Sequence, residues 1–512
     1  MEAIWNSVAV SVLSVLFSGV VGTLLAFGLT QIQFRGRSLL SRLAVVPIAL
    51  PPLVGVIAFL FVFGESGILP RVMQDLAGSK APPLYLDGFW AIVAIHVYSF
   101  YVYFYLFVST ALRQIDASVM EAAAGLGSSP WKTFRRVVFP ELRPSLVGAS
   151  ILTFMASMAS FSAPLLFAGE KRFFTLLIYT TKLNGEMNLA AAQAMLLTFV
   201  AMGFFVALQI TSGREVRVGR AKGVPRRGTL TLGRPVQALF IAVIVLMLVL
   251  VLLPLITIVL ISFAQEGSWT VQVLPGAYTV ENYLRLFTDP RILEPVRNSI
   301  VMGAVTLVAV ILVGVTGAYL ITKGALRRVR TLMDVILTIP YAIPGTVIAV
   351  SLILAFNVPT PFSGFQILVG TFWILPLAYF IRLYPFVVRS TTAALEQLDD
   401  ALLEAGESFG AGPWRRFRRI ALPLIFPGIV SGALLTVISA LGEFVSSILL
   451  YTYSSRPISV EILSQLRTFN FGAAAAYCVL LLVLILAIVW ASNYIVNRGF
   501  SGSKRQETRG KK

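Results

Sequence analysis

The stretch Glu121-Ala-Ala-Ala-Gly-Leu-Gly127 decides how this chain is organised, because it occurs a second time as Glu404-Ala-Gly-Glu-Ser-Phe-Gly410. The repeat continues through an aromatic and basic segment to Pro144 in the first copy and to Pro427 in the second. Corresponding residues are 283 positions apart without a gap, and 10 of the 24 pairs are identical. Both copies are polar and amphipathic, yet each lies between long apolar runs. This pattern predicts a duplicated cytoplasmic loop in a membrane protein.

The composition also indicates a membrane protein. Of the 512 residues, 57% are hydrophobic and 12% are charged, which is too much apolar surface for a soluble globule. Apolar runs of about 20 residues recur, as a helix needs to cross a hydrocarbon core of about 30 Å. The net charge of +18 indicates a positive-inside bias rather than a nucleic-acid partner. With one cysteine and one histidine, neither a disulfide framework nor a His/Cys metal site is expected.

The apolar runs predict eleven membrane-spanning helices, so the expected fold is an all-α integral membrane protein. Their approximate ranges are 5–30, 42–63, 88–112, 145–168, 188–212, 236–263, 298–322, 332–356, 366–388, 427–452 and 472–497. The side that carries both repeated loops holds about three quarters of the Lys and Arg residues. The positive-inside rule therefore places the amino terminus outside and the carboxyl terminus in the cytoplasm.

The duplication extends beyond the loop. Asn6-Ser7 opens the first predicted helix and Asn298-Ser299 opens the seventh, while Pro51 in the second helix corresponds to Pro344 in the eighth. Each repeat then contains five helices, with the repeated loop between its third and fourth. Two such repeats joined directly would have opposite orientations, and the additional helix 236–263 restores the same orientation. The sequence therefore predicts two parallel five-helix repeats plus one linking helix.

This arrangement predicts the domain boundaries. A basic linker is expected to join the halves in the cytoplasm, where its arginines would attract acidic lipid headgroups. The predicted segments are 1–212 for the first repeat with its loop at about 113–144, 213–235 for the linker, 236–263 for the additional helix, 264–297 for an extracytoplasmic loop, 298–497 for the second repeat with its loop at about 389–427, and 498–512 for a basic cytoplasmic tail.

The first copy of the loop is predicted to fold as two short helices joined at glycine. The segment 122–124 favours helix and Gly127 breaks it. Ser129 is placed to cap a second helix that begins at Pro130, and Pro140 is expected to end it. The result would be a helix–Gly–helix hairpin.

The second helix of the hairpin is amphipathic in both copies. Trp131 and Phe134 lie three residues apart on one face, as Trp414 and Phe417 do in the second copy, and the basic side chains are directed elsewhere. Helices of this kind often lie on a lipid surface. Two copies in phase favour instead a partner with two equivalent grooves.

The motif resembles the cytoplasmic loop of binding-protein-dependent ABC importer permeases: Glu-Ala-Ala, a Gly six residues after the Glu, and a Pro thirteen residues after the Gly. The resemblance covers nearly the whole chain and implies a type I importer permease whose loops are coupling helices in clefts of two ATPase subunits. Gly406 departs from the usual alanine and is expected to loosen its helix. The resemblance implies a docking surface of Glu121, Ala122, Ala123, Gly127, Trp131 and Phe134 in the first copy and of Glu404, Ala405, Gly410, Trp414 and Phe417 in the second.

A closer resemblance is to the fused, double-length permeases of the ferric-iron and thiamine importer group, through segments such as Ser160-Phe-Ser-Ala-Pro164 and Ala440-Leu-Gly-Glu-Phe444. It implies import of a small solute, ferric iron before others, through the cytoplasmic membrane of a bacterium or archaeon. The chain would bind no cofactor and catalyse no reaction, since the partner ATPases use ATP and Mg²⁺. An extracytoplasmic solute-binding protein would dock on outer loops 64–87, 169–187, 264–297 and 453–471.

Four residues are candidates for the transport pathway. Glu443 is a carboxylate in a spanning segment, which is costly unless it faces a cavity or a partner, and its counterpart is Ser160. Both lining the pathway and pairing with a polar neighbour remain open for Glu443. Pro51 and Pro344 would break their helices where the backbone can line a cavity, although ordinary kinks explain them almost as well.

Other function classes find less support. An ion-coupled secondary transporter acting without an ATPase is the alternative, but intramembrane acids are scarce and the repeats are parallel. A membrane enzyme would need clustered His, Asp or Glu, and the sequence shows no such cluster. Gly127-Ser-Ser-Pro-Trp-Lys-Thr133 lacks the second glycine of a phosphate loop. His96 is expected to be a packed core residue, and Arg382 to extend toward the cytoplasmic surface.

Overall fold

The computed structural model describes residues 1–115, 118, 122–123, 125–212, 234–323 and 327–509. Within these ranges the chain is helical, with one isolated β-bridge between Ala264 and Tyr278. It separates into two units, Met1–Ile261 with Ser268–Gly276, and Ser262–Gly267 with Ala277–Lys512. Most of the predicted linker lies outside the described residues, so the domain boundaries stay a prediction.

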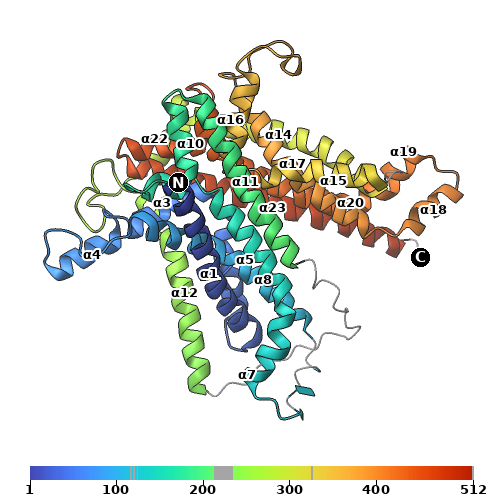
Figure 1. Cartoon of the computed structure of the whole chain (residues 1–512), viewed down its shortest axis with the longest axis horizontal. Helices are drawn as coiled ribbons and strands as arrows, with labels where there is room; N and C mark the ends of the chain where they lie inside the picture. Colours follow the sequence, from blue (N-terminus) through green and yellow to red (C-terminus); the bar gives the residue numbers. More distant parts are fainter. Residues whose placement is uncertain (116–117, 119–121, 124, 213–233, 324–326, 510–512) are drawn as a thin grey trace. The chain divides into compact units, whose positions relative to one another are not determined.

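The first unit is built around α1, which packs along α5 and α8, while α12 packs on α3 (Figure 1). Its elements are α1 (Glu2–Gln31), α2 (Arg37–Leu43), η1 (Val46–Ala49), α3 (Pro52–Phe63), α4 (Ile68–Ala77), α5 (Gly88–Gln114), α7 (Pro130–Thr133), η2 (Phe134–Val138), α8 (Phe139–Met158), α9 (Ser162–Phe167), α10 (Phe174–Leu183), α11 (Met187–Ser212) and α12 (Arg234–Ile261).

The second unit repeats this plan, with α14 packed along α17 and α20. Its elements are α13 (Glu281–Thr288), α14 (Pro290–Lys323), α15 (Arg327–Ala342), α16 (Gly345–Phe356), η3 (Pro361–Ser363), α17 (Ile374–Glu396), α18 (Asp400–Ser408), α19 (Pro413–Arg416), η4 (Phe417–Ala421), α20 (Leu422–Leu441), α21 (Val445–Leu450), α22 (Ile458–Arg467) and α23 (Phe471–Arg509).

Equivalent hydrogen bonds hold the first helix of each unit. Ser7 Oγ accepts from the Phe174 N–H at 2.9 Å, and Ser299 Oγ accepts from the Ile458 N–H at 2.8 Å. The asparagine before each serine donates its amide to a carbonyl just before the same helix, α10 or α22. The repeated Asn-Ser pair therefore joins the first spanning helix to the start of α10 or α22 in the same way in both halves.

Among the described residues, nine helices are long and apolar enough to cross a membrane. The predicted count of eleven is not confirmed. The predicted span 332–356 is divided at Pro344, and the predicted span 366–388 begins only at Ile374, because 357–373 form an irregular connection with left-handed turns at Gly364 and Gly370.

The predicted breaks at the two prolines are confirmed. Pro51 and Pro344 each precede a 12-residue helix, α3 or α16, with nearly the same extended backbone (φ −54° and −58°, ψ 136° and 144°). An extended ψ before α3 fits the next residue, Pro52, whose ring disfavours helical backbone at the residue before it. Both prolines are buried inside their units.

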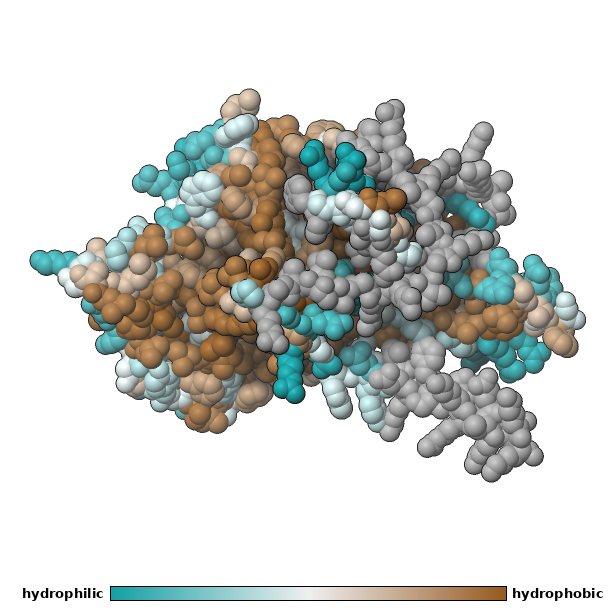
Figure 2. Space-filling model, turned by 90° about the horizontal axis from the view of Figure 1, so that it is seen from below, coloured by the Kyte–Doolittle hydropathy of each residue, from teal (hydrophilic) through white to brown (hydrophobic). Residues whose placement is uncertain are grey.

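The exterior of the described helices suits a bilayer. Much of the described surface drawn in Figure 2 is hydrophobic, with smaller hydrophilic patches between and beside the hydrophobic areas. The helix α12 has the highest mean hydropathy of the candidate spans, and only 22% of that window is buried. Apolar side chains on such a surface require lipid rather than water. The protein is therefore a multi-pass membrane protein.

Helix packing in the first unit requires Gly22. A Cβ at Gly22 would lie 2.3 Å from the carbonyl oxygen of Tyr101, whereas a Cβ at the equivalent Gly314 would lie 2.8 Å from the side chain of Val387. We expect Gly22→Ala to lower the free energy of unfolding by about 2 kcal/mol, and Gly314→Ala by less, because its closest contact, at 2.8 Å rather than 2.3 Å, is a milder clash. Thermal unfolding of the two detergent-solubilised variants checks this, and equal losses would contradict it.

Candidate functional site

The second hairpin consists of α18, a glycine turn and α19, and it extends beyond the end of α17 (Figure 1). The carboxylate of Asp399 caps α18 by accepting from the Ala401 N–H at 3.0 Å. After α18 the chain reverses at Gly410, whose φ of +76° favours glycine, and the Gly410 N–H donates to the Glu407 carbonyl at 2.8 Å. The helix–Gly–helix prediction is confirmed here.

The two helices of the second hairpin are tied together. Arg416 Nη1 lies 2.5 Å from Glu407 Oε2, which joins α19 to α18. A Cβ at Gly406 would lie 2.6 Å from Ile420 Cδ1. The glycine that departs from the usual motif therefore lets α18 approach η4 closely. Close packing explains a glycine at this position, in addition to its expected loosening of the helix.

The first hairpin has the same turn. Gly127 has φ of +71°, and the Leu126 and Ser128 N–H groups donate to the carbonyls of Ala122 and Ala123, both at 3.0 Å. As predicted, Ser129 caps the second helix, with its Oγ accepting from the Lys132 N–H at 3.4 Å. The predicted docking residue Glu121 and the side chain of Trp131 lie outside the described residues.

The prediction that Pro140 ends the second helix is wrong. The helix continues through the π-helical turn η2 into α8, and the Phe139 N–H donates to the Phe134 carbonyl five residues back. The second copy does the same before Pro423, where the Leu422 N–H donates to the Phe417 carbonyl. A π turn widens the helix just where proline lacks an N–H and its ring would clash with the preceding turn.

Two predicted docking residues, Phe134 and Phe417, pack partly against their own unit, and their docking role stays a prediction. The ring of Phe134 meets Phe27 of α1 edge-on with centroids 5.5 Å apart, and Phe417 meets Tyr319 of α14 in the same way at 5.7 Å. Both rings are half-buried. They therefore anchor each hairpin to the first helix of its unit. Trp414 remains exposed, as do Ala122, Gly127, Glu404, Ala405 and Gly410.

The tips of the hairpins carry two residues that the sequence analysis missed. Leu126 is 89% exposed and Phe409 is 90% exposed, and each directly precedes the left-handed glycine of its turn. The signal was present, since these residues are paired in the alignment of the two copies and both are large and apolar. Each hairpin thus presents an apolar tip.

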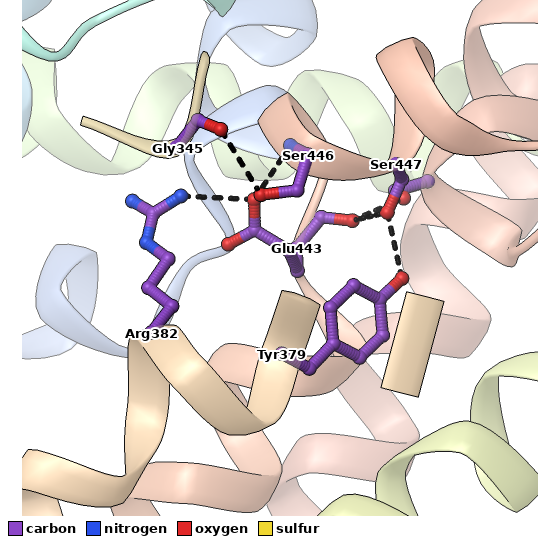
Figure 3. A network of polar contacts seen from close by, with 7 residues as sticks. Gly345, Tyr379, Arg382, Glu443, Ser446 and Ser447 are labelled. Carbon is purple, nitrogen blue, oxygen red and sulfur yellow. Dashed lines mark hydrogen bonds and ion pairs between the residues drawn. The ribbon is translucent and has the colours of Figure 1, made fainter. Parts of the chain in front are cut away.

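A second polar site lies at a break between α20 and α21, and Figure 3 shows it. Glu443 Oε1 accepts from Arg382 Nη1 at 2.9 Å and from the Ser446 N–H at 3.0 Å. The Glu443 carbonyl accepts from Ser447 Oγ at 2.6 Å and from Ser459 Oγ at 2.8 Å. Glu443 is 7% exposed and Arg382 28% exposed, so the ion pair is largely buried.

The carboxylate of Glu443 is paired with a polar neighbour, Arg382, and its role in lining the pathway stays a prediction. The expectation that Arg382 extends toward the cytoplasmic surface is wrong. A Cβ at Gly345 would lie 2.2 Å from Arg382 Nη1, so the guanidinium occupies the space that a side chain would need. The break after Pro344 and the break at Glu443 therefore meet at one ion pair.

The equivalent break in the first unit is uncharged. Ser160 Oγ lies 2.9 Å from His96 Nε2, and His96 Nδ1 lies 3.1 Å from Ser14 Oγ and 2.9 Å from Ser157 Oγ. The prediction that His96 is a packed core residue is confirmed, since it is buried and both ring nitrogens are bonded. At the same spacing of 283, the second unit has Tyr379 in place of His96. The two units thus differ in charge at matching places.

In the part of the chain that the structure describes, no group of three or more His, Cys, Asp and Glu could hold a metal ion. The polar network at Glu443 combines one carboxylate with one guanidinium and hydroxyl groups. Such an arrangement can hold helices in place.

Comparisons with known proteins agree with this architecture. The family model described as binding-protein-dependent transport system inner membrane component matches residues 18–265 and 311–500. The chain is 27% identical over 492 residues to a probable ABC transporter permease protein from Sinorhizobium fredii, covering 95% of this chain and 86% of that protein. It is also 27% identical over 504 residues to a ferric transport system permease protein from Actinobacillus pleuropneumoniae, covering 94% and 69%.

A sulfate transport system permease protein from Escherichia coli is 28% identical over 225 residues, which is 42% of this chain and 80% of that protein. The shorter relative thus corresponds to less than half of this chain. The family model matches this chain in two separate regions. Because these two regions together span most of the 512 residues, the chain belongs to the family of binding-protein-dependent transport system inner membrane components.

Proposed function

We propose that this chain is a transmembrane permease subunit of an ATP-driven importer and supplies both halves in one polypeptide. The observation that carries the proposal is the pair of matching hairpins, each with an apolar residue about nine-tenths exposed at its tip. Large apolar side chains presented singly on a rigid turn are typical anchors for a groove in another protein. Two such tips at equivalent places fit two copies of one partner.

The partner would be an ATPase subunit, since a permease needs an energy source that the chain's own site residues do not supply. Each ATPase would receive one hairpin, and closure of the two ATPases on ATP and Mg²⁺ would move the hairpins. The π turn and the ring anchored to the first helix, Phe134 or Phe417, would transmit this movement into each unit. Glu404, Ala405 and Gly410 with Glu121, Ala122, Ala123, Gly127, Trp131 and Trp414 complete the proposed docking surface.

The solute would come from an extracytoplasmic binding protein, and we favour ferric iron. The ferric relative aligns with nearly the whole chain, whereas the sulfate relative aligns with less than half of it. In this proposal the protein lies in the cytoplasmic membrane with its amino terminus outside and both hairpins in the cytoplasm. That orientation places the basic side of the chain inside.

Affinity purification of the tagged chain from native membranes tests the proposal. We expect an ATPase with a phosphate-loop motif at about two copies per chain, together with a binding protein whose ligand can then be measured with ferric iron, sulfate and thiamine. Recovery of this chain alone, under conditions that keep another importer of the same membrane intact, would contradict the docking role. Uptake by the purified chain under an ion gradient without an ATPase would establish a secondary transporter instead.

A further inference from the structure

The connection between α16 and α17, residues 357–373, differs from the other outer connections in its charge. It contains no Asp, Glu, Lys or Arg in 17 residues. The predicted outer connections 64–87, 169–187, 264–297 and 453–471 each carry between three and seven charged residues. The corresponding segment of the first unit, 64–87, has five. The chain therefore keeps one uncharged connection among charged ones.

This connection also exposes its apolar side chains. Phe362 is 94% exposed and Phe365 is 73% exposed, and Trp373, Ile367 and Val358 are exposed as well. The segment stands out at the top of Figure 1 as the gold loop that follows α16. Several large apolar side chains in a short segment without charges would be unfavourable in water. The sequence is suited to a surface that is itself apolar.

Part of the backbone of the connection is hydrogen-bonded within the chain. Thr360 and Ser363 form a capping box, and the Phe365 N–H donates to the Thr360 carbonyl at 2.8 Å. Ser363 Oγ donates to the Gln366 carbonyl at 2.6 Å. The Leu368 N–H donates to the carbonyl of Phe356, in α16, at 3.2 Å. Internal hydrogen bonds of this kind lower the cost of bringing irregular backbone close to the hydrocarbon region.

Phe365 adopts a backbone conformation that glycine would adopt more easily. Its φ is +59°, and among the described non-glycine residues only Phe365 and Phe469 have positive φ. The turn directs the exposed rings outward although glycine already supplies the neighbouring left-handed residue, Gly364. A phenylalanine in this conformation carries a backbone cost, and its ring is nevertheless exposed.

We propose that residues 357–373 lie in the interfacial layer of the bilayer, with the rings of Phe362, Phe365 and Trp373 among the lipid headgroups and the upper acyl chains. Trp and Tyr are enriched in this layer at the ends of spanning helices, and Phe, Trp and Leu form the apolar face of segments that lie in it. The connection joins α17 at Ile374, and α17 ends at Glu396 just before the second hairpin. The connection and the hairpin therefore lie at opposite ends of α17, which places the connection in the outer leaflet if the hairpin is cytoplasmic.

A protein partner fits this segment less well. Binding proteins are soluble, and recognition of a soluble partner normally includes polar contacts at the rim of the interface. The charged outer connections can supply such contacts, whereas 357–373 cannot offer a charged side chain. The inference does not depend on the ATPase or on the transported solute, because it concerns only the contact with lipid.

Site-directed fluorescence of the full chain in lipid nanodiscs tests the proposal. Phe362→Cys would carry an environment-sensitive maleimide dye, and the wild-type chain serves as the labelling blank because Cys478 is buried. We expect a blue-shifted dye that is quenched several-fold more strongly by lipids spin-labelled near the top of the acyl chain than by aqueous iodide. Ile367→Cys provides a second position in case the first variant folds poorly.

Leu76→Cys is the matched control, since Leu76 is also strongly exposed but lies on α4 among charged residues. At this position we expect the opposite order, with iodide the stronger quencher. Iodide quenching at Phe362→Cys and Ile367→Cys as strong as at Leu76→Cys would overturn the proposal. Protection of the Phe362→Cys dye by an added solute-binding protein, without quenching by lipid, would also overturn it in favour of a protein contact.

Discussion

Replacement of Leu126 and Phe409 together by alanine should abolish ATP-dependent uptake while the chain remains folded in the membrane. The two side chains are about nine-tenths exposed, so truncation removes almost no contact inside the chain and leaves no cavity. The change in the free energy of unfolding should stay within about 0.5 kcal/mol. If each side chain fills a groove of an ATPase, its burial contributes about 1.5–3 kcal/mol to binding. Loss of one tip then weakens binding roughly 10- to 100-fold.

The measurement is ATPase binding to the purified chain in nanodiscs, with solute uptake in reconstituted vesicles beside it. The single variants Leu126→Ala and Phe409→Ala should each retain one tip and show intermediate binding. Phe417→Ala is the internal control, because its ring packs on Tyr319 and its loss should lower thermal stability more than it lowers affinity. Wild-type affinity in the double variant would refute the docking role of the tips.

The hairpins show how far sequence could lead. The turn at Gly410 and the cap at Ser129 follow from local chemistry, because a glycine with positive φ and a serine before a helix act on their immediate neighbours. The continuation through Pro140 did not follow, since a π turn that accepts proline has no residue signature of its own. Burial of Phe134 against Phe27 was equally inaccessible, because it depends on a helix about 100 residues earlier.

Of the helix breaks, likewise, some could be predicted from local sequence and others could not. Those at Pro51 and Pro344 could be predicted because proline constrains the backbone at and before itself. The breaks at Ser160 and Glu443 contain no proline, and the runs 145–168 and 427–452 look like continuous spans. Their free carbonyls are satisfied from another helix, by Thr175 Oγ1 in the first unit and by Ser459 Oγ in the second.

Part of the connection 357–373 was predicted as helix, because the predicted span 366–388 includes its last residues. Its uncharged run from Ile367 to Trp373 is as apolar as the start of a span, and hydropathy does not distinguish an apolar turn from an apolar helix. In the structure, the left-handed Gly370 and the hydrogen bonds to the Phe356 carbonyl make this segment a turn rather than a helix. Exposed apolar residues next to a span are therefore the least predictable class in this chain.

Glu443→Ala should strongly destabilise the second unit. It leaves Arg382, which is 28% exposed, without its partner, and it removes the acceptor of the Ser446 N–H at the start of α21. Removing one member of a buried ion pair costs about 3–5 kcal/mol, and the partial exposure of Arg382 lowers this to about 2–4 kcal/mol. Ser160→Ala, the matched change at the equivalent break of the first unit, which has no ion pair, should cost only about 1 kcal/mol for one hydrogen bond.

A double-mutant cycle separates a structural ion pair from a group needed for transport. In Glu443→Ala/Arg382→Met no charge is left unpaired, so thermal unfolding should occur closer to the wild-type temperature than in Glu443→Ala alone. Glu443→Gln keeps an acceptor for Arg382 and Ser446 and should fall between them. If the double variant regains stability and uptake, the pair only fastens the breaks at Pro344 and Glu443 together. If it regains stability without uptake, the charge itself is required during transport. A double variant as unstable as Glu443→Ala would show that the ion pair is not what holds these helices.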